Sequence, residues 1–193
     1  MYGSSFAKKI HTFYSIDISQ NSLVLCDIDD TLLVFPKCPE AFYNEAYDYY
    51  TNIGYNAHLT KKFIYNDWEL NRYFKKPSIT DKEGFFHLLE RIEKTNSTLC
   101  FLTARSGFYH QKTINDLEKV NINGNKFKIY YTNGSVKGDY IKQNINLLDY
   151  NNVIFVDDNN DQLENVNKEV PFITCYKFIH IDNNPEPNTI TFN

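Results

Sequence analysis

The decisive stretch of this sequence is Leu23-Val-Leu-Cys-Asp-Ile-Asp-Asp-Thr-Leu32. Its first four residues are apolar or small at every position, which predicts a strand buried on both faces and therefore part of a parallel sheet. The strand runs directly into Asp27, Asp29 and Asp30. Open α/β sheets bind their ligands at the carboxyl ends of strands, so these acids are expected at a binding site.

The acids allow two interpretations. Carboxylates about 4 Å apart repel by roughly 4 kcal/mol at an effective dielectric near 20, and a divalent cation would compensate them. Asp side chains and carbonyl oxygens are ligands that Mg²⁺ prefers. The same residues also suit a turn or a helix N-terminus, where acids interact favourably with the helix dipole. This stretch alone leaves both interpretations open.

The composition sets broad limits on the fold and on the partners. The chain has 193 residues, of which 42% are hydrophobic and 16% aromatic. One domain over 1–193 with a small insertion is therefore expected. The formal net charge of −4 does not favour a nucleic acid or an anionic membrane as partner. It excludes neither as a local contact.

The cysteines and the hydropathy pattern bear on the compartment. Cys26, Cys38, Cys100 and Cys175 are widely spaced, and three of them lie in apolar runs. They are expected to be buried free thiols, as in a reducing compartment. We find neither an N-terminal apolar run of signal-peptide length nor one of about 18 apolar residues. An intracellular, soluble protein with no membrane partner is expected.

Apolar runs alternate with helical patterns along the chain, which predicts an α/β fold with a mostly parallel sheet. We expect an irregular lead-in over 1–22 and a polar tail over 183–193. Strands are expected over about 23–26, 98–102, 127–131, 153–156 and 172–176. Helices are expected over about 108–119, from Lys137 with a face of Ile141, Ile145 and Leu148, and around Leu163 and Val166.

Three further helices are expected between the first and second predicted strands. In the first, Tyr43, Ala46, Tyr47 and Tyr50 share one helical face, and the next has Thr60 as N-cap with Phe63, Leu70 and Phe74 on one side. The third follows a capping box from Thr80 to Glu83 and buries Phe85, Leu88, Leu89 and Ile92. A crossover needs only about a dozen residues. The surplus predicts that the first two of these helices form a small cap over 36–80, although the same two helices would also fit the core.

The strand ends together supply Asp27-x-Asp29, then Thr103, then Lys137, then Asp157-Asp158. In this order the motifs resemble those of the haloacid dehalogenase (HAD) superfamily of phosphatases and phosphotransferases, over about 23–166. In response-regulator receiver domains the acidic pair comes first, whereas here it comes last. The resemblance implies a Rossmann-like parallel sheet flanked by helices, with a small cap inserted after the first strand.

The resemblance also implies residue roles. Asp27 would be the nucleophile that takes the phosphoryl group, and Asp29 the general acid and base. Thr103 would donate its hydroxyl to the phosphate, helped by the backbone at Ala104 and Arg105. Taken alone, Thr103 would fit a strand-end or helix N-cap threonine better than a phosphate contact.

Other roles remain alternatives at this point. Lys137 would neutralise phosphate and nucleophile, and Lys142 competes for that role. Each would otherwise be an ordinary surface lysine. Arg105 would reach a substrate anion or remain solvated.

A magnesium site is implied as well. Asp158 would be a direct Mg²⁺ ligand beside Asp27 and the backbone carbonyl of Asp29. Asp157 and Asp161 would orient ligands or waters around the ion. Asp30 stands where many superfamily members have Gly, and no chemistry is assigned to it.

More narrowly, Phe101-Leu-Thr-Ala-Arg105, Lys137-Gly138 and Ile154-Phe-Val-Asp-Asp158 resemble a little-characterised bacterial HAD acid-phosphatase-like family. The resemblance implies a Mg²⁺-dependent phosphomonoester hydrolase that forms an aspartyl-phosphate on a small phosphorylated substrate. The alternatives are transfer to an acceptor other than water, a polynucleotide 3′-phosphatase, and a catalytically silent binding module. The sequence assigns neither the substrate nor an oligomeric state.

Overall fold

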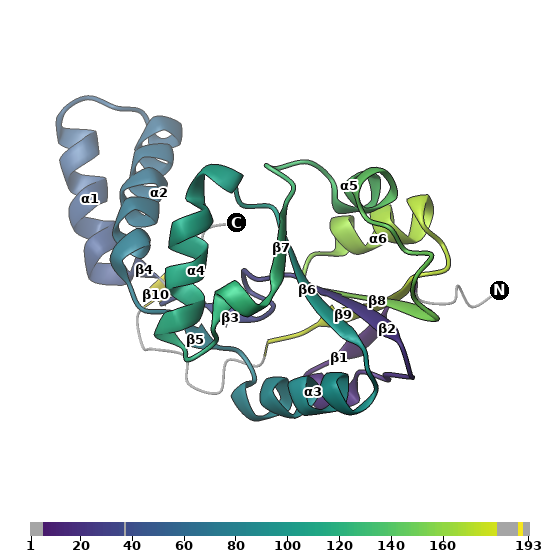
Figure 1. Cartoon of the computed structure of the whole chain (residues 1–193). Coiled ribbons are helices and arrows are strands. Elements are labelled where there is room, and N and C mark those ends of the chain that lie inside the picture. Colours follow the sequence, from purple (N-terminus) through teal and green to yellow (C-terminus); the bar gives the residue numbers. More distant parts are fainter. Residues whose placement is uncertain (1–5, 37, 181–188, 191–193) are drawn as a thin grey trace. The chain divides into compact units, whose positions relative to one another are not determined.

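A computed structural model of the chain describes residues 6–36, 38–180 and 189–190. Its central element is a six-stranded sheet in which every neighbouring pair is parallel (Figure 1). In spatial order the strands are β1 (Lys8–Ile10), β9 (Thr174–Phe178), β8 (Asn152–Asp157), β2 (Ser22–Cys26), β6 (Thr98–Thr103) and β7 (Lys128–Tyr131). The α/β fold with a parallel sheet is confirmed.

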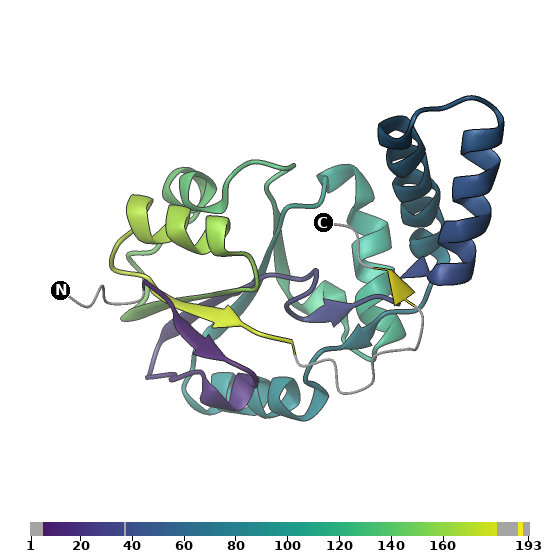
Figure 2. The same cartoon turned by 180° about the vertical axis from the view of Figure 1, so that it is seen from behind.

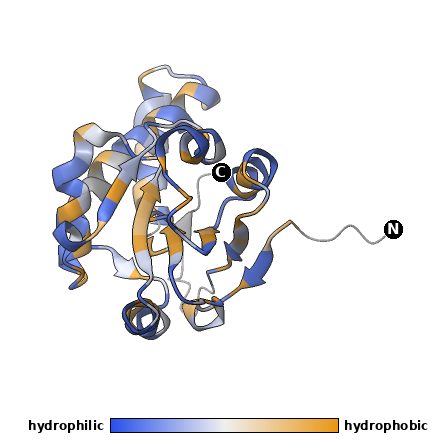
Figure 3. Cartoon of the chain, turned by 45° about the vertical axis from the view of Figure 1, so that its right-hand side comes forward, coloured by the Kyte–Doolittle hydropathy of each residue, from blue (hydrophilic) through white to orange (hydrophobic). Residues whose placement is uncertain are grey.

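Strand β2 lies in the middle of the sheet because its side chains are apolar or small on both faces. All five of its residues are buried. It pairs with β8 on one side and β6 on the other, and Cys26 lies opposite both Val156 and Phe101. The colouring by hydropathy shows the central strands as mainly hydrophobic (Figure 3).

Helices cover both faces of the sheet. They are α3 (Lys82–Lys94), α4 (His110–Lys119), α5 (Lys137–Asn144) and α6 (Asn160–Glu169). Alternate strand residues such as Leu25, Leu102 and Phe155 pack with Ile141 of α5 and Leu163 of α6 in one core. Helix α3 lies on the opposite face, as both views show (Figures 1 and 2). Short 3₁₀ turns, η1 (Phe13–Ser15), η2 (Gly107–Tyr109) and η3 (Gly124–Lys126), join these elements.

The strand order reverses beside β2. From β2 the chain moves outward to β6 and β7, and then returns to β8 on the other side of β2. The carboxyl ends of β2 and β8 therefore flank a topological switch point, where open α/β sheets bind their ligands.

The chain divides into two compact units, and the second contains Phe35–Pro77. It holds β4 (Cys38–Pro39), α1 (Glu40–Asn52), α2 (Ala57–Phe74) and β10 (Thr189–Ile190), which pairs with β4. In the first unit, β3 (Leu33–Val34) pairs antiparallel with β5 (Ser78–Ile79), where the chain leaves that unit and returns to it. The function of the region 36–80 as a cap stays a prediction.

The prediction of an irregular lead-in over 1–22 is wrong in part within the described residues. Lys8–Ile10 forms β1, which pairs with β9 at the sheet edge. In this strand only Ile10 is buried. Edge strands commonly carry exposed charged residues, so the sequence gives no apolar run there. The predicted polar tail lies outside the described residues except at Thr189 and Ile190.

The prediction for α2 needs correction. The helix begins at Ala57, so Thr60 is a buried position inside it rather than its N-cap. Leu70 and Phe74 are exposed, whereas Ile64 and Trp68 share the buried face with Thr60. These three residues follow a spacing of four, which is one side of a helix.

The start of α3 differs from the predicted capping box. Asp81, not Thr80, is the N-cap, and its carboxylate accepts a hydrogen bond from the amide of Gly84. The Thr80 hydroxyl instead donates to the carbonyl of Thr31 at 2.6 Å. The predicted face of the helix is largely confirmed, because Phe85, Leu88 and Ile92 are buried and Leu89 is half-buried.

Two predicted element ends are wrong. Helix α5 ends at Asn144, so Leu148 lies beyond it and is exposed, while Ile141 and Ile145 are buried. Strand β9 starts at Thr174, and Phe172 before it is exposed.

All four cysteines are buried free thiols, as predicted. Within the described ranges, no helix combines the length and the apolar character that a bilayer span requires.

Candidate active site

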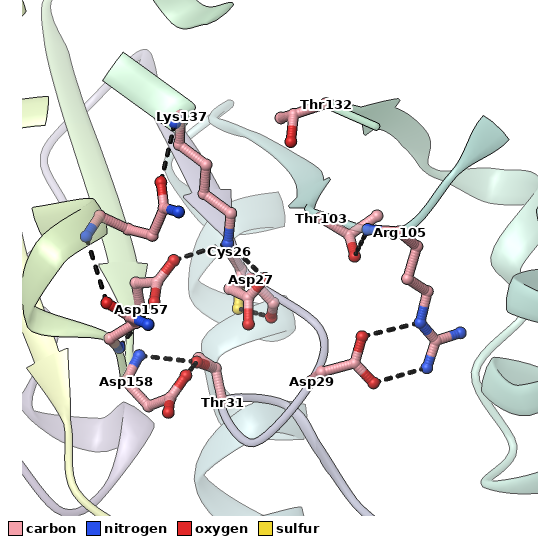
Figure 4. Close-up of polar contacts among 12 residues, drawn as sticks. Cys26, Asp27, Asp29, Thr31, Thr103, Arg105, Thr132, Lys137, Asp157 and Asp158 are labelled. Atoms are coloured by element: carbon pink, nitrogen blue, oxygen red, sulfur yellow. Dashed lines mark hydrogen bonds and ion pairs between the residues drawn. The ribbon is translucent and has the colours of Figure 1, made fainter. Parts of the chain in front are cut away.

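The carboxyl ends of β2, β6 and β8 bring the predicted polar residues together (Figure 4). Asp27 directly follows β2, Thr103 ends β6 and Asp157 ends β8. The amide of Asp27 donates to the carbonyl of Val156, so the β2–β8 ladder continues into the site. Asp27, Thr103 and Asp157 are all buried.

Lys137 joins two of the buried carboxylates. Its Nζ lies 2.5 Å from Oδ1 of Asp27 and 2.6 Å from Oδ2 of Asp157. Burial alone would lower the pKa of Lys137, but the charges of Asp27 and Asp157 outweigh it and raise that pKa. Lys137 is therefore held as a buried cation. Lys142, the competing candidate, lies away from the cluster and pairs with Glu169 at 3.0 Å.

Side chains of α6 fix the start of the helix that carries Lys137. The residue before α5 provides no side-chain cap. Instead, the amide of Lys137 donates to Oε1 of Gln162, and the amide of Gly138 donates to Oδ1 of Asn165, both at 2.8 Å. These contacts satisfy two of the amides that a helix start leaves without partners, and they set the position of Lys137.

Asp27, Asp157 and Asp158 form a cluster in which one carboxylate oxygen from each residue lies within 4.8 Å of the other two. The hydroxyl of Thr31 accepts from the amide of Asp158 at 2.9 Å and donates to its Oδ1 at 3.2 Å. Asp157 accepts from the amide of Asn159 at 2.8 Å. Asp158 is thus held by a side chain of the loop after β2, and Asp157 by a backbone amide of its own loop.

The charge balance of this cluster suits a divalent cation. Three carboxylates face one ammonium group, that of Lys137, so two negative charges remain uncompensated when all three acids are ionised. Burial, together with the negative charges of Asp157 and Asp30, raises the pKa of Asp158 to about 6. Hard oxygen donors with surplus negative charge fit an ion such as Mg²⁺.

Asp29 binds Arg105 rather than joining the aspartate cluster. Nε of Arg105 donates to Oδ2 of Asp29, and NH2 donates to Oδ1, both at 2.8 Å. Figure 4 shows the two side chains side by side, with a dashed line at each of these hydrogen bonds. The hypothesis of a solvated Arg105 is thereby corrected, because this side chain is only 14% exposed.

A second acid, Asp116, binds the opposite side of the guanidinium group of Arg105. Its NH1 donates to Oδ2 of Asp116 at 3.1 Å and to the hydroxyl of Thr113 at 3.2 Å, both from α4. Asp116 is completely buried. Lys112 also donates to Oδ2 of Asp116 at 2.5 Å. The charges of Asp29 and Asp116 raise the pKa of Arg105 against the opposing effect of burial.

The hydroxyl oxygen of Thr103 accepts a hydrogen bond from the backbone, which leaves its proton available for donation. The backbone amide of Arg105 donates to its Oγ1 at 3.1 Å, so the hydroxyl proton can be directed elsewhere. Next to it, Ala104 is exposed, and its carbonyl accepts from the amide of Gly134. That contact ties the loops after β6 and β7 together.

The structure thus places Asp27, Lys137, Asp157 and Asp158 in direct contact or close proximity, with Asp29 across from them. Asp161 is exposed in the first turn of α6 and does not join the described cluster. Sequence reasoning missed four residues that hold the site in place: Thr31, Asp116, Gln162 and Asn165. Thr31 could have been found from its place beside the acids, but the others have no local signal.

A family model described as "Protein of unknown function (DUF2608)" matches residues 7–130. The chain belongs to this family. The matched part of this DUF2608 chain includes Asp27 and Thr103 and ends before Lys137. No curated protein matches it significantly.

Three solved structures are similar to this DUF2608 protein. A chain of a Pnkp1/Rnl/Hen1 complex matches with a TM-score of 0.44 at 16% identity, covering 87% of this chain and 49% of its own length. This chain therefore spans about half of that one. A Thermotoga maritima protein assigned as a beta-phosphoglucomutase has a TM-score of 0.52 at 13% identity, with coverage of 86% and 88%.

The third is the Legionella pneumophila effector Ceg4, solved with an N-terminal yeast Hog1p sequence. It has a TM-score of 0.46 at 12% identity, with coverage of 86% of this chain and 90% of its own. Of the three, only the T. maritima structure exceeds a TM-score of 0.5. At 13% identity, that likeness shows a shared fold.

Proposed function

We propose that this protein is a HAD-type phosphatase that hydrolyses small phosphomonoesters through an aspartyl-phosphate on Asp27. The observation that carries the proposal is the buried ion pair between Asp27 and Lys137, set beside Asp157 and Asp158 at the switch point of a parallel sheet. A buried carboxylate beside a fixed cation suits a nucleophile whose target is an anionic phosphoryl group.

The first proposed step transfers the phosphoryl group. A carboxylate oxygen of Asp27 attacks phosphorus, and the bond from phosphorus to the leaving oxygen breaks. Asp29 donates a proton to that oxygen, which leaves as an alcohol. In the second step Asp29 takes a proton from water, whose oxygen attacks the phosphorus of the aspartyl-phosphate. Inorganic phosphate leaves and the carboxylate of Asp27 is restored.

Two other side chains would stabilise the transferring group. The ammonium group of Lys137 would face phosphoryl oxygens as well as Asp27, since it already lies 2.5 Å from Oδ1 of that residue. The Thr103 hydroxyl would donate to a second phosphoryl oxygen. Fixed donors of this kind act most strongly in a site that is largely shielded from water.

The acidic cluster would hold the metal ion that the resemblance implies. Asp27 and Asp158 would be its carboxylate ligands, with the backbone carbonyl of Asp29, and Asp157 would orient the site through Lys137 and the amide of Asn159. When bound, Mg²⁺ would supply positive charge that offsets the charge of the phosphoryl group.

The test is the hydrolysis of para-nitrophenyl phosphate with and without Mg²⁺ by wild type and by Asp27→Asn. The variant keeps the shape of the side chain and removes its charge. We expect metal-dependent turnover that Asp27→Asn reduces by at least about a thousandfold. Asp161→Asn, which neutralises a nearby exposed acid, is the matched control and should retain activity.

Each other outcome contradicts part of the proposal. Turnover in Asp27→Asn at the wild-type rate would overturn the covalent route. Phosphate release only after an acceptor alcohol is added would identify a phosphotransferase. Turnover of a 3′-phosphorylated oligonucleotide but of no small ester would identify a polynucleotide phosphatase. No turnover across these substrates from folded, Mg²⁺-loaded protein would favour a binding module.

A further inference from the structure

We propose that Arg105 is a positioning residue that holds Asp29 for proton transfer, and that Asp116 of α4 holds Arg105 in turn. This inference rests on the proposed function, because it gives Asp29 the part of proton donor and acceptor. It replaces the earlier hypothesis that Arg105 contacts a substrate anion.

The contact between Arg105 and Asp29 fixes the carboxylate as a whole. Two donors of the guanidinium group meet the two oxygens of Asp29, each at 2.8 Å. A planar fork of this kind defines the plane and the direction of a carboxylate, which a single donor would leave free to rotate. Proton transfer requires such placement, because a displacement of about 1 Å can cost about a hundredfold in rate.

The guanidinium group is itself fixed from its other side. NH1 donates to Oδ2 of Asp116 and to the hydroxyl of Thr113, on a helix that packs beside the site. Arg105 thus links a loop residue, Asp29, to the regular backbone of α4. The side chain of Asp116 is 1% exposed, so it has little freedom to turn away.

Asp116 is also surrounded by cations of its own helix. Lys112 lies one turn before it and donates to Oδ2, and Lys119 lies 3.6 Å from Oδ1 on the following turn. A buried ion cluster is weak as a source of stability, because the cost of desolvating the charges offsets much of their attraction. Its effect here is to hold Arg105 at one place.

Both sides of the guanidinium group are therefore engaged by protein. A phosphate that reached Nε and NH2 of Arg105 would have to displace Asp29 from them. A positioning residue and a substrate contact differ in what they change. Loss of a residue that positions Asp29 lowers kcat through Asp29 alone. Loss of a residue that contacts the substrate raises KM and weakens inhibition by phosphate.

The experiment compares Arg105→Lys, Asp116→Asn and the control Glu118→Gln, which neutralises an exposed acid on the same helix. We expect Arg105→Lys and Asp116→Asn to lower kcat about 10- to 100-fold, with KM and the inhibition constant of inorganic phosphate within about twofold of wild type. Glu118→Gln should match wild type. Thermal melting identifies any variant that fails to fold.

A double-mutant cycle then tests whether the effect passes through Asp29. In an Asp29→Asn background, Arg105→Lys is expected to change kcat by less than about twofold, because the residue it positions no longer transfers protons. If Asp116→Asn does not fold, the cycle between Arg105 and Asp29 decides the question by itself.

Two results would overturn the inference. One is a tenfold rise in KM and in the phosphate inhibition constant for Arg105→Lys at unchanged kcat. The other is an equal loss of kcat for Arg105→Lys in the wild-type and the Asp29→Asn backgrounds. The proposed function would survive both, since it is tested separately by the loss of activity in Asp27→Asn and by the turnover of small phosphomonoesters by wild type.

Discussion

The amide nitrogen of Gly138 lies 2.8 Å from Oδ1 of Asn165, so the start of α5 rests directly on α6. A Cβ added at Gly138 would lie 2.7 Å from the backbone oxygen of Asn165, closer than real Cβ contacts allow. Glycine is therefore required at this position by the close approach of the two helices, and the position of Lys137, the preceding residue, depends on it.

Gly138→Ala is accordingly expected to lower the free energy of unfolding by about 1–3 kcal/mol, the usual cost of overpacking. It should also lower phosphatase activity, because α5 must shift and Lys137 with it. Chemical denaturation measures the first effect, and Gln143→Ala on the exposed side of α5 is the control. A gain of about 1 kcal/mol, the usual effect of Gly→Ala inside a helix, would contradict this account.

Lys137→Met keeps the length of the side chain and removes its charge. Asp27 and Asp157 then remain buried without their cation, and we expect a loss of about 3–5 kcal/mol in stability at neutral pH. Activity should fall at least about a hundredfold. Lys142→Met is the matched control: its pair with Glu169 lies at the surface, and the change should stay within about 0.5 kcal/mol. Equal effects of the two variants would refute the assignment of Lys137.

Mg²⁺ is expected to stabilise the wild-type protein. At ten times its dissociation constant, a ligand that binds only the folded state adds about 1.4 kcal/mol, which corresponds to a melting temperature higher by about 3–6 °C. Asp158→Asn should abolish this shift and Asp161→Asn should preserve it. Differential scanning fluorimetry at constant ionic strength gives the comparison. A shift that persists in Asp158→Asn would place the ion elsewhere.

Asp30 adopts the left-handed backbone conformation, with φ of 60°. A side chain costs about 1 kcal/mol in this region, while Gly enters it freely. Asp30→Gly removes this cost but increases the backbone entropy of the unfolded chain, so the free energy of unfolding is expected to stay within about 0.5 kcal/mol. Asp30→Val, whose side chain is branched at Cβ, is expected to lower it by about 1–2 kcal/mol. Urea denaturation of both variants measures the difference, and equal stabilities would show that the conformation is not decisive.

Much of the fold follows from local pattern. Strands such as β2 and β8 are apolar over most of their length and run into acids, so both their location and their parallel pairing are evident from the residues. Strand β1 is different: two of its three residues are exposed lysines, and only the pairing with β9 makes it a strand. Which of two possible faces of α2 is buried depends on packing, and the local sequence pattern does not determine that packing.

The residues of the candidate site also differ in how far the sequence predicts them. Most of the residues that we assign to the chemistry, such as Asp27, Thr103 and Asp158, stand at or just after strand ends, where an α/β sheet binds its ligands. Their residue types and places make them recognisable in the sequence. The residues that hold these side chains in place are harder to recognise from the sequence. Gln162 and Asn165 meet α5 only because α6 packs against it, and the pair of Asp29 with Arg105 depends on side-chain rotamers. Asp116 looks like any polar residue of an amphipathic helix until its burial is known.

The central place of β2 has a consequence during synthesis. One edge of β2 pairs with β6, but the other pairs with β8, which is made more than a hundred residues later. Until the ribosome has added β8, a nascent chain carries an apolar strand with an open edge. Such an edge is a template for pairing with other chains. Chains truncated between β7 and β8 are therefore expected to aggregate, and the completed sheet removes that hazard at the same moment that it brings Asp157 beside Asp27.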